Sequence, residues 1–372
     1  MAHTLLVGTT KGAFLLRCDA GRDAWSIAGP FCDGWPINHI IGDAAKGTLW
    51  AAGGGDFPGA GVWRSQDGGQ SWALTLLANG KFDDMLANSP EMVEYVGHGP
   101  APDAPFKGQI DALWSLCLVG DTLFAGAKPA ALFASTDHGD TWARVQGLSD
   151  HPSGDSWQPG GAGLTLHTIV ADRADPAKMW VGISAAGVFA TTDGGKTWDR
   201  RNRLSNDQDH GTCGHEVGHC VHNMVQAAGA GEVLYQQNHH GTFRSPDGGR
   251  SWQEITAGLP SNFGFPIAAH PTDPATLWVL PLNGDSIGRF PPGASAAVYK
   301  STDAGETWVA KTNGLPTENC FFTVLRQAMA TDSQDGVYFG TNSGSVFASG
   351  DAGETWAEVA RHLPTVLCVE VL

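Results

Sequence analysis

One octapeptide, S/T-x-D-x-G-x-S/T-W, recurs six times along the chain and constrains the fold more than any other feature. The copies run over residues 65–72, 135–142, 191–198, 245–252, 301–308 and 349–356. A degenerate copy at residues 19–25 precedes them and keeps an aspartate and the final tryptophan. Repetition of this kind is typical of solenoids and propellers, in which every repeat is one small structural unit. We therefore expect seven similar units.

The octapeptide has the chemistry of a tight turn between two strands. Aspartate accepts hydrogen bonds from the backbone of its own turn, and glycine adopts the positive φ that such turns need. Around the copy at 191–198, four short segments have strand-like patterns: residues 166–171, 179–183, 187–191 and 197–200. Seven such units predict an all-β fold, a seven-bladed β-propeller with four-stranded antiparallel blades. The recurring tryptophan is expected to pack between neighbouring blades.

The two ends of the chain predict how the ring closes. Residues 4–9 match the second strand of the first unit, which leaves that unit without an inner strand. Residues 365–371 have a strand pattern and can supply it, which removes the open edges that an unclosed sheet would expose. We therefore expect one propeller domain over residues 1–372, with blade 1 built from about 1–31 plus 365–372.

Composition argues against several classes of partner. The chain has 22 Lys plus Arg against 38 Asp plus Glu, a formal charge of −16, and no run of basic residues. Nucleic acids and anionic membranes attract clustered positive charge, so neither is expected to bind. The seven cysteines are scattered and include no CxxC pair, which argues against a disulfide framework. The sequence shows no secretion signal and no long apolar stretch, so the cytoplasm is the expected location.

The octapeptide resembles the Asp-box, or BNR, repeat of sialidases, sortilin-type receptors, xyloglucanases and a photosystem assembly factor. This resemblance extends over the whole chain and implies the propeller fold. Residues 220–222, 236–239 and 263–266 also resemble segments of bacterial BNR-repeat proteins labelled as glycosyl-hydrolase-like. The likeness to sialidases implies glycoside hydrolysis, but residues 289–292 depart from their F-R-I-P segment, and no arginine triad stands at the inner-strand starts. We therefore expect no true sialidase activity.

The long connections fall on one face of the predicted propeller. In a four-stranded meander, the octapeptide turns share one face, here called the bottom face, and the connections between blades lie on the opposite, top face. Four long segments are assigned to the top face: residues 77–109, 146–163, 202–218 and 281–295. Long loops that decorate one face of a rigid scaffold commonly carry function. We therefore expect the site in the central funnel at the top, and a structural role for the octapeptide aspartates.

Three histidines align at one repeat position, at the start of the inner strand in three blades: His39, His167 and His222. Neutral imidazole is the commonest metal ligand, so the three could hold a divalent ion such as Zn²⁺, Fe²⁺ or Mn²⁺. The alternative is a metal-free site in which His222 is a general base and Glu216 and Asp111 supply carboxylates. Histidines that only bond to backbone groups or channel water would explain the same pattern.

Aromatic and amide side chains are expected around the same mouth. Rings can stack on a sugar or line an apolar pocket, and amides can bind hydroxyl groups. The candidate ligand-binding residues are Trp114, Trp157, Gln237, Asn238, His239 and Phe265. With the histidines, they predict a hydrolase or lyase that acts on a small polar or carbohydrate ligand, with or without a metal. The alternative is a non-catalytic binding or assembly propeller that holds a partner protein.

Overall fold

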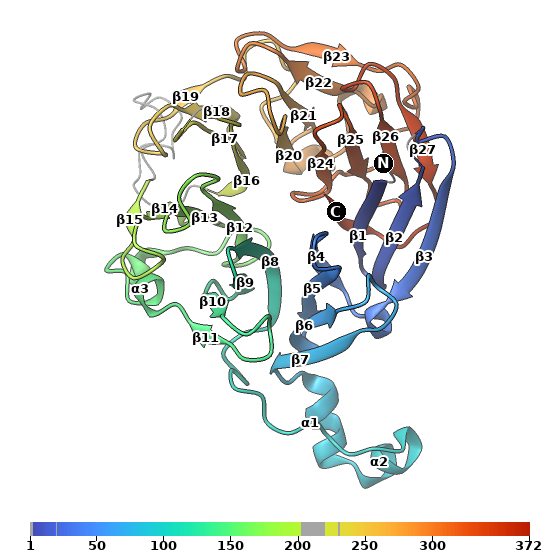
Figure 1. Cartoon of the computed structure of the whole chain (residues 1–372), viewed down its shortest axis with the longest axis vertical. Coiled ribbons are helices and arrows are strands. Elements are labelled where there is room, and N and C mark those ends of the chain that lie inside the picture. Colours follow the sequence, from blue (N-terminus) through green and yellow to red (C-terminus); the bar gives the residue numbers. More distant parts are fainter. Residues whose placement is uncertain (1–2, 20, 202–219, 230) are drawn as a thin grey trace.

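The structure is a computed structural model that describes residues 3–19, 21–201, 220–229 and 231–372. Within these residues, the strands form seven four-stranded antiparallel sheets that surround a central channel (Figure 1). The predicted seven-bladed propeller is therefore confirmed. In every sheet the strands follow one another in chain order from the channel outward, except in blade 1, where the last strand of the chain is innermost.

The blades are numbered in chain order, and their strands are given from the innermost outward. Blade 1 comprises β28 (Val366–Val371), β1 (His3–Thr9), β2 (Gly12–Cys18) and β3 (Trp25–Phe31). Blade 2 comprises β4 (Ile37–Asp43), β5 (Thr48–Gly55), β6 (Gly59–Ser65) and β7 (Ala73–Ala78). Blade 3 comprises β8 (Ala112–Val119), β9 (Thr122–Lys128), β10 (Leu132–Ser135) and β11 (Ala143–Arg144), and blade 4 comprises β12 (Leu166–Ala171), β13 (Met179–Ile183), β14 (Gly187–Thr191) and β15 (Asp199–Arg200). Blade 5 comprises β16 (Val221–Gln226), β17 (Leu234–Asn238), β18 (Thr242–Ser245) and β19 (Gln253–Glu254). Blade 6 comprises β20 (Gly264–Ala269), β21 (Leu277–Pro281), β22 (Val298–Ser301) and β23 (Val309–Lys311). Blade 7 comprises β24 (Met329–Thr331), β25 (Val337–Gly340), β26 (Val346–Ser349) and β27 (Ala357–Ala360).

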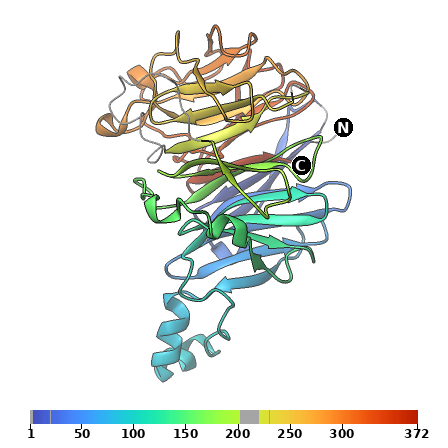
Figure 2. The same cartoon turned by 90° about the vertical axis from the view of Figure 1, so that its left-hand side faces the viewer.

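Helices are few and short. Helices α1 (Lys81–Asn88) and α2 (Pro90–Val96) form an arm that projects from blade 2 beyond the ring (Figures 1 and 2). A single turn, α3 (Gln146–Ser149), follows β11. Short 3-10 turns occupy Cys32–Gly34, Gly154–Ser156, Asp285–Ile287 and Pro292–Ala294. No helix in the described part of the chain is both long and apolar enough to cross a membrane.

The last strand closes the ring, as the two chain ends predict. Strand β28 pairs antiparallel with β1, with Leu5 opposite Val371 and Val7 opposite Val369. Leu5, Val7 and Val369 are fully buried in the core shared with blade 7. Closure therefore combines backbone hydrogen bonds with apolar contacts. Strand β1 is not left as an unpaired edge of blade 1.

Each octapeptide forms the turn between the third and fourth strands of its blade, and its side chains bond in the same way every time. In blade 5, Ser245 Oγ donates to Asp247 Oδ1 at 2.9 Å and accepts from the Gly249 N–H at 2.7 Å. The backbone N–H and the hydroxyl of Ser251 both donate to the Asp247 carboxylate, at 2.8 and 2.7 Å. The equivalent four bonds occur in the other five copies.

Tryptophans link these turns to adjacent blades. The indole N–H groups of Trp50, Trp180 and Trp278, on the second strands of blades 2, 4 and 6, donate to backbone carbonyls in the octapeptide turns of blades 3, 5 and 7. In the opposite direction, the octapeptide residues Trp252 and Trp308 donate to carbonyls that follow the last strands of blades 4 and 5. The expected packing of tryptophan between blades is confirmed at these positions.

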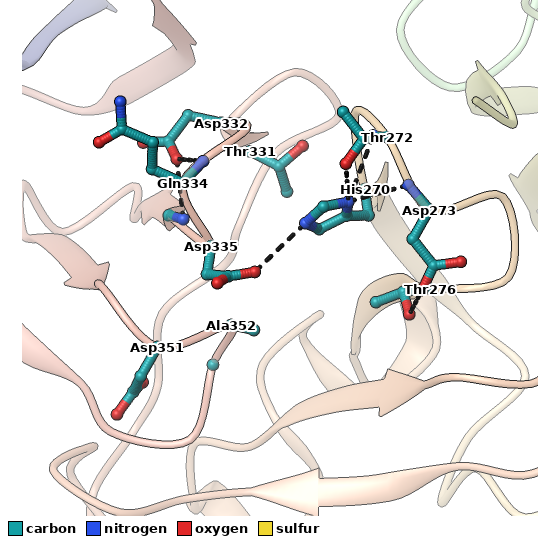
Figure 3. Close-up of polar contacts among 12 residues, drawn as sticks. His270, Thr272, Asp273, Thr276, Thr331, Asp332, Gln334, Asp335, Asp351 and Ala352 are labelled. Carbon is teal, nitrogen blue, oxygen red and sulfur yellow. Dashed lines mark hydrogen bonds and ion pairs between the residues drawn. The ribbon is translucent and has the colours of Figure 1, made fainter. Parts of the chain in front are cut away.

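The turns between first and second strands share the bottom face with the octapeptides (Figure 3). In blade 7, Asp332 Oδ1 accepts two backbone N–H groups of its own turn. At the corresponding place in blade 6, His270 Nδ1 accepts the N–H groups of Thr272 and Asp273, at 3.2 and 3.0 Å. Its Nε2 points to Asp335 of blade 7 at 3.4 Å. His270 therefore replaces the usual aspartate as an acceptor and carries its hydrogen on Nε2.

Replacing Asp247 with alanine should lower the free energy of unfolding by about 1–3 kcal/mol, because three donors of the turn lose a partly buried acceptor. Urea denaturation followed by tryptophan fluorescence measures the change. Asp155→Ala, at an exposed acid of a top-face loop, is the matched control and should leave the unfolding midpoint within error. Equal midpoints for the two variants would contradict a structural role for the turn.

Acid should weaken the ring through the same carboxylates. Hydrogen bonds from the turn hold the pKa of Asp193 and of Asp303 at about 2, below the ordinary 3.8. Because these pKa values are lowered in the folded state, the stability they confer is complete above the unfolded value and is lost as the pH falls from about 4 toward 2. Urea midpoints measured across this window should fall steeply, and less steeply in Asp193→Asn. A midpoint that stays level from pH 5 to below pH 3 would refute this.

Candidate functional site

The inner strands of six blades share an irregularity near their first residues. In each, an extra residue interrupts the register with the second strand: Leu367 of blade 1, Asn38, Trp114, His167, His222 and one of the pair Phe265–Pro266. A bulge of this kind is left out of the ladder and re-aims its side chain. The residues that follow the bulges in blades 2, 4, 5 and 6 line the central channel, namely His39, Thr168, Asn223 and Ile267.

His39 therefore does not occupy the same position as the other two histidines. It follows the bulge of its strand, whereas His167 and His222 are the bulged residues of theirs. A shift of one residue sends a side chain to the other side of a strand. Both ring nitrogens of His39 also have partners, since Nδ1 accepts the Leu116 N–H at 2.8 Å and Nε2 lies 3.1 Å from Glu370 Oε1. The described residues do not bring the predicted metal triad together.

The central channel holds a cavity of about 320 Å³ that lies toward the bottom face, along the C-terminal halves of inner strands such as β12 and β16. Near the top, side chains bridge the ring. Gln327 Nε2 of blade 7 donates to the His167 carbonyl of blade 4 at 2.7 Å. Asn223 Nδ2 of blade 5 donates to the Arg326 carbonyl at 2.7 Å. These side chains occupy the top of the channel, so the thiol, imidazole and guanidinium groups described next lie beside the axis rather than in a central funnel.

A thiol and two imidazoles meet at the top of blade 5. Cys220 precedes β16, His222 is its bulged residue, and His239 follows β17. One potential ligand atom from each lies within 4.8 Å of the other two, and these three residues are here called the Cys–His cluster. Cys220 is 9% exposed, His222 is fully buried and His239 is partly buried. His222 Nδ1 donates to the Gly264 carbonyl at 2.6 Å, and its Nε2 has no hydrogen-bond partner.

Two phenyl rings and two guanidinium groups border the Cys–His cluster. The ring of His222 lies 4.7 Å from that of Phe265 and 5.3 Å from that of Phe263, measured between centroids. The guanidinium carbons of Arg326 and Arg289 lie 4.9 and 5.6 Å from the centroid of Phe265. Arg289 Nε donates to Asp285 Oδ1, whereas Arg326 Nε has no hydrogen-bond partner. Blades 5, 6 and 7 thus each contribute to one group of polar side chains around Phe265.

Burial and the arginine charge set the protonation of this group. Burial lowers the pKa of His167 and of His222 well below the ordinary value, and the positive charge of Arg326 lowers both further. Burial raises the pKa of the Cys220 thiol, but hydrogen bonds with His239 and Ser184 and the charges of His239 and Arg326 outweigh it, so this pKa is lowered. At neutral pH both buried imidazoles are therefore uncharged, beside a thiol that ionises more readily than an ordinary one.

Several predicted residues have structural partners instead of a free surface. Gln237 Nε2 donates to carbonyls of its own turn and of Asn262, and Gln237 Oε1 accepts from Thr242. Asn238 Oδ1 accepts two backbone N–H groups of the same turn. Phe265 is 2% exposed, so it forms the floor beneath the arginines and cannot offer a face to a sugar. These three residues shape the site and do not line it.

The remaining predicted residues lie elsewhere. Asp111 is exposed at the start of blade 3, where its N–H donates to the Lys128 carbonyl. The ring centroid of Trp157 lies 5.1 Å from that of Phe189 in blade 4. Trp114 is partly buried on β8 of blade 3, two blades away from the Cys–His cluster of blade 5. Glu216 lies outside the described residues.

Sequence reasoning missed Cys220, Arg289 and Arg326 as site residues. The spacing of Cys220 and His222 by two could have indicated a shared side, because alternate residues of an extended chain point the same way. Arg326 lies in the loop before β24. Arg289 was considered only as part of a sialidase motif. The six cysteines that the structure describes are free thiols, as expected.

Comparison with known proteins supports the fold. No family model matches the chain. A segment of 189 residues, 49% of the chain, is 27% identical to the probable oligoxyloglucan-reducing end-specific xyloglucanase of Neosartorya fischeri, and it spans only 19% of that protein. The GH74 xyloglucanase from Xanthomonas campestris aligns over 97% of this chain and 56% of its own length, with a TM-score of 0.60 and 17% identity. YCF48 bound to D1 peptide aligns over 84% of this chain and 78% of its own, with a TM-score of 0.50 and 14% identity.

The thiol of Cys220 should ionise at a lower pH than the thiols of Cys117 and Cys368. Burial raises the pKa of Cys117 and of Cys368 to about 12, whereas that of Cys220 is lowered. Iodoacetamide labelling followed by mass spectrometry, with a chelator present so that trace metal cannot cover the thiol, should give a midpoint for Cys220 below the ordinary thiol value. His239→Ala should move that midpoint upward. A midpoint at or above the ordinary value in the unsubstituted protein would contradict the described surroundings.

Proposed function

We propose that the chain is a hydrolase or lyase that acts on a small polar ligand of the carbohydrate class, and that this ligand carries an acidic group. The ligand binds on the top face between the Cys–His cluster and the two arginines. The observation that carries this proposal is the placement of Arg289 and Arg326 against Phe265, directly beside His222. Elsewhere on the top face, the predicted polar residues bond to backbone groups of their own turns.

The arginines account for recognition. A guanidinium group offers five donors in a fixed plane that suits carboxylate and phosphate oxygens. Arg326 is partly buried and keeps an unpartnered Nε–H, and burial lowers its pKa. An anionic group of the ligand would relieve this desolvation, since two like charges stand close together and Asp285 pairs with Arg289 alone among the described residues. Arg289 and Arg326 would bind a neutral analogue of the ligand much more weakly.

His239 is the residue that we assign to proton transfer. It is the least buried member of the Cys–His cluster, and it follows β17 at the start of a connecting loop. Its ring lies 4.5 Å from that of His222 and 5.3 Å from that of Phe263, which restrict its orientation. An imidazole held in this way can remove a proton from water or from substrate, or return one to a leaving group. His222, buried and uncharged, positions it.

The likeness to xyloglucanases supports the substrate class and no more. The chain spans about a fifth of the curated relative it matches, so the polymeric substrate in that protein's name does not carry over. The YCF48 likeness favours the alternative, a propeller that binds a peptide. The projecting arm fits that alternative, because Tyr95 of α2 is 86% exposed and Phe57 beside α1 is 56% exposed.

Matched substrates should separate these possibilities. We expect hydrolysis or elimination of chromogenic uronides or sugar phosphates, with much weaker turnover of the neutral sugar of the same configuration. Arg289→Met should raise KM for the acidic substrate about 10–100-fold, as expected from the loss of about 1.5–3 kcal/mol for a hydrogen bond to a charged group.

The control is Arg17→Met, on the bottom face, which should leave turnover unchanged. His239→Ala should instead lower kcat while KM stays close to that of the unsubstituted protein. If neither acidic nor neutral substrates are turned over by the folded protein, the enzyme proposal fails and the peptide-binding alternative stands.

A further inference from the structure

The Cys–His cluster has the chemistry of a transition-metal site. A thiolate and two imidazoles are the donors that zinc prefers, and a set without carboxylates disfavours magnesium, calcium and manganese. The three potential ligand atoms already lie within 4.8 Å of one another in the described structure. Around a tetrahedral zinc ion, with bonds of about 2.0–2.3 Å, such atoms are about 3.3–3.6 Å apart. Metal binding would therefore draw the ligand atoms closer together, and His239 is the least buried of the three residues.

A second, independent observation comes from His222. This ring is fully buried, yet its Nε2 has no hydrogen-bond partner. A buried polar atom without a partner is costly and calls for a ligand or an ordered water. The other ring nitrogen donates to the Gly264 carbonyl at 2.6 Å, which holds the hydrogen on Nδ1 and leaves the Nε2 lone pair free. Metal-binding histidines are commonly held by a backbone carbonyl in this way.

The surroundings of Cys220 are consistent with a coordinated sulfur. Ser184 Oγ lies 3.4 Å from its Sγ, and the guanidinium group of Arg326 is also a hydrogen-bonding neighbour. A Cβ atom at Gly160 would lie 3.3 Å from the same sulfur, so the backbone of this loop covers it closely. Hydrogen-bond donors around a ligating thiolate and a tight cover of backbone are typical of sites that orient their ligands.

We propose that Cys220, His222 and His239 bind one zinc ion through Sγ, Nε2 and a ring nitrogen of His239. On binding, the thiol loses its proton to solvent and the sulfur becomes a thiolate ligand. Three protein ligands leave a fourth position for water or for an anionic oxygen. This inference concerns metal binding and does not depend on the proposed enzymatic activity.

Metal content tests the inference directly. Protein purified without a histidine tag, stripped with a chelator and dialysed against ZnSO₄ should hold one zinc per chain by elemental analysis. Loaded with Co²⁺ instead, it should show the intense near-ultraviolet band of thiolate-to-cobalt charge transfer together with the visible bands of a tetrahedral ion. Cys220→Ser should abolish the charge-transfer band, and His239→Ala should weaken zinc binding more than about 100-fold, beyond the loss usual for outer-shell partners.

Matched controls separate loss of a ligand from loss of the fold. His240→Ala alters the neighbouring histidine of the same turn and should keep both the zinc and the cobalt spectrum. Circular dichroism and the unfolding midpoint should be the same for His239→Ala and His240→Ala without metal. The proposal is overturned if the stripped protein takes up no zinc, if cobalt binds without a thiolate band, or if His239→Ala and Cys220→Ser bind zinc as tightly as the unsubstituted protein. Because none of these readouts involves turnover, failure here leaves the proposed activity untouched.

Discussion

The hydrogen bonds of the octapeptide turn are the interaction on which the rest of the structure depends. One carboxylate and one hydroxyl organise eight residues, so that the third and fourth strands of each blade leave the turn in a fixed direction. The same turns present carbonyls to tryptophans of adjacent blades, as Trp180 shows with Gly248. Local turn geometry and the spacing of blades are therefore coupled. A bottom face built in this way is occupied by structural bonds, which leaves the top face for function.

The top face is shaped by departures from regularity. Six inner strands carry a bulge close to their first residues, and the bulged side chain leaves the ladder. In blade 5 this device turns His222 away from the channel and toward Phe265 of blade 6. The channel side is taken by the next residue, Asn223, which bonds to the loop of blade 7. The bulges thus send some polar side chains, such as Asn223, into the hydrogen-bond network of the channel, and others, such as His222, to the site beside it.

Two kinds of chemistry meet at that site. The Cys–His cluster supplies soft and borderline donors, and Arg289 and Arg326 supply positive charge above an apolar floor. An anion bound by the arginines would lie close to a metal cation bound by the Cys–His cluster. The attraction between the two opposite charges would favour the binding of both. Ligand recognition by the arginines is therefore compatible with the proposed zinc site. Proton transfer by His239 is an alternative to zinc binding by the same ring, because a ring nitrogen that ligates zinc has no free lone pair to accept a proton. The two proposals are tested by different measurements.

The sequence by itself determined the number of blades, the place of every octapeptide turn and the strand that closes the ring. These features depend on contiguous residues whose hydrogen bonds are local, and on alternation that can be read along a single strand. It did not determine which side chains meet at the top. Alignment treated His39 as equivalent to His167 and His222, because a bulge of one residue leaves no mark in the sequence while it reverses the side of the strand. Cys220 and His239 come together because β16 and β17 pair within blade 5. Only the tertiary structure decided that Arg289 and Arg326 join them, because blades 5, 6 and 7 must be assembled side by side before residues of all three can meet around Phe265.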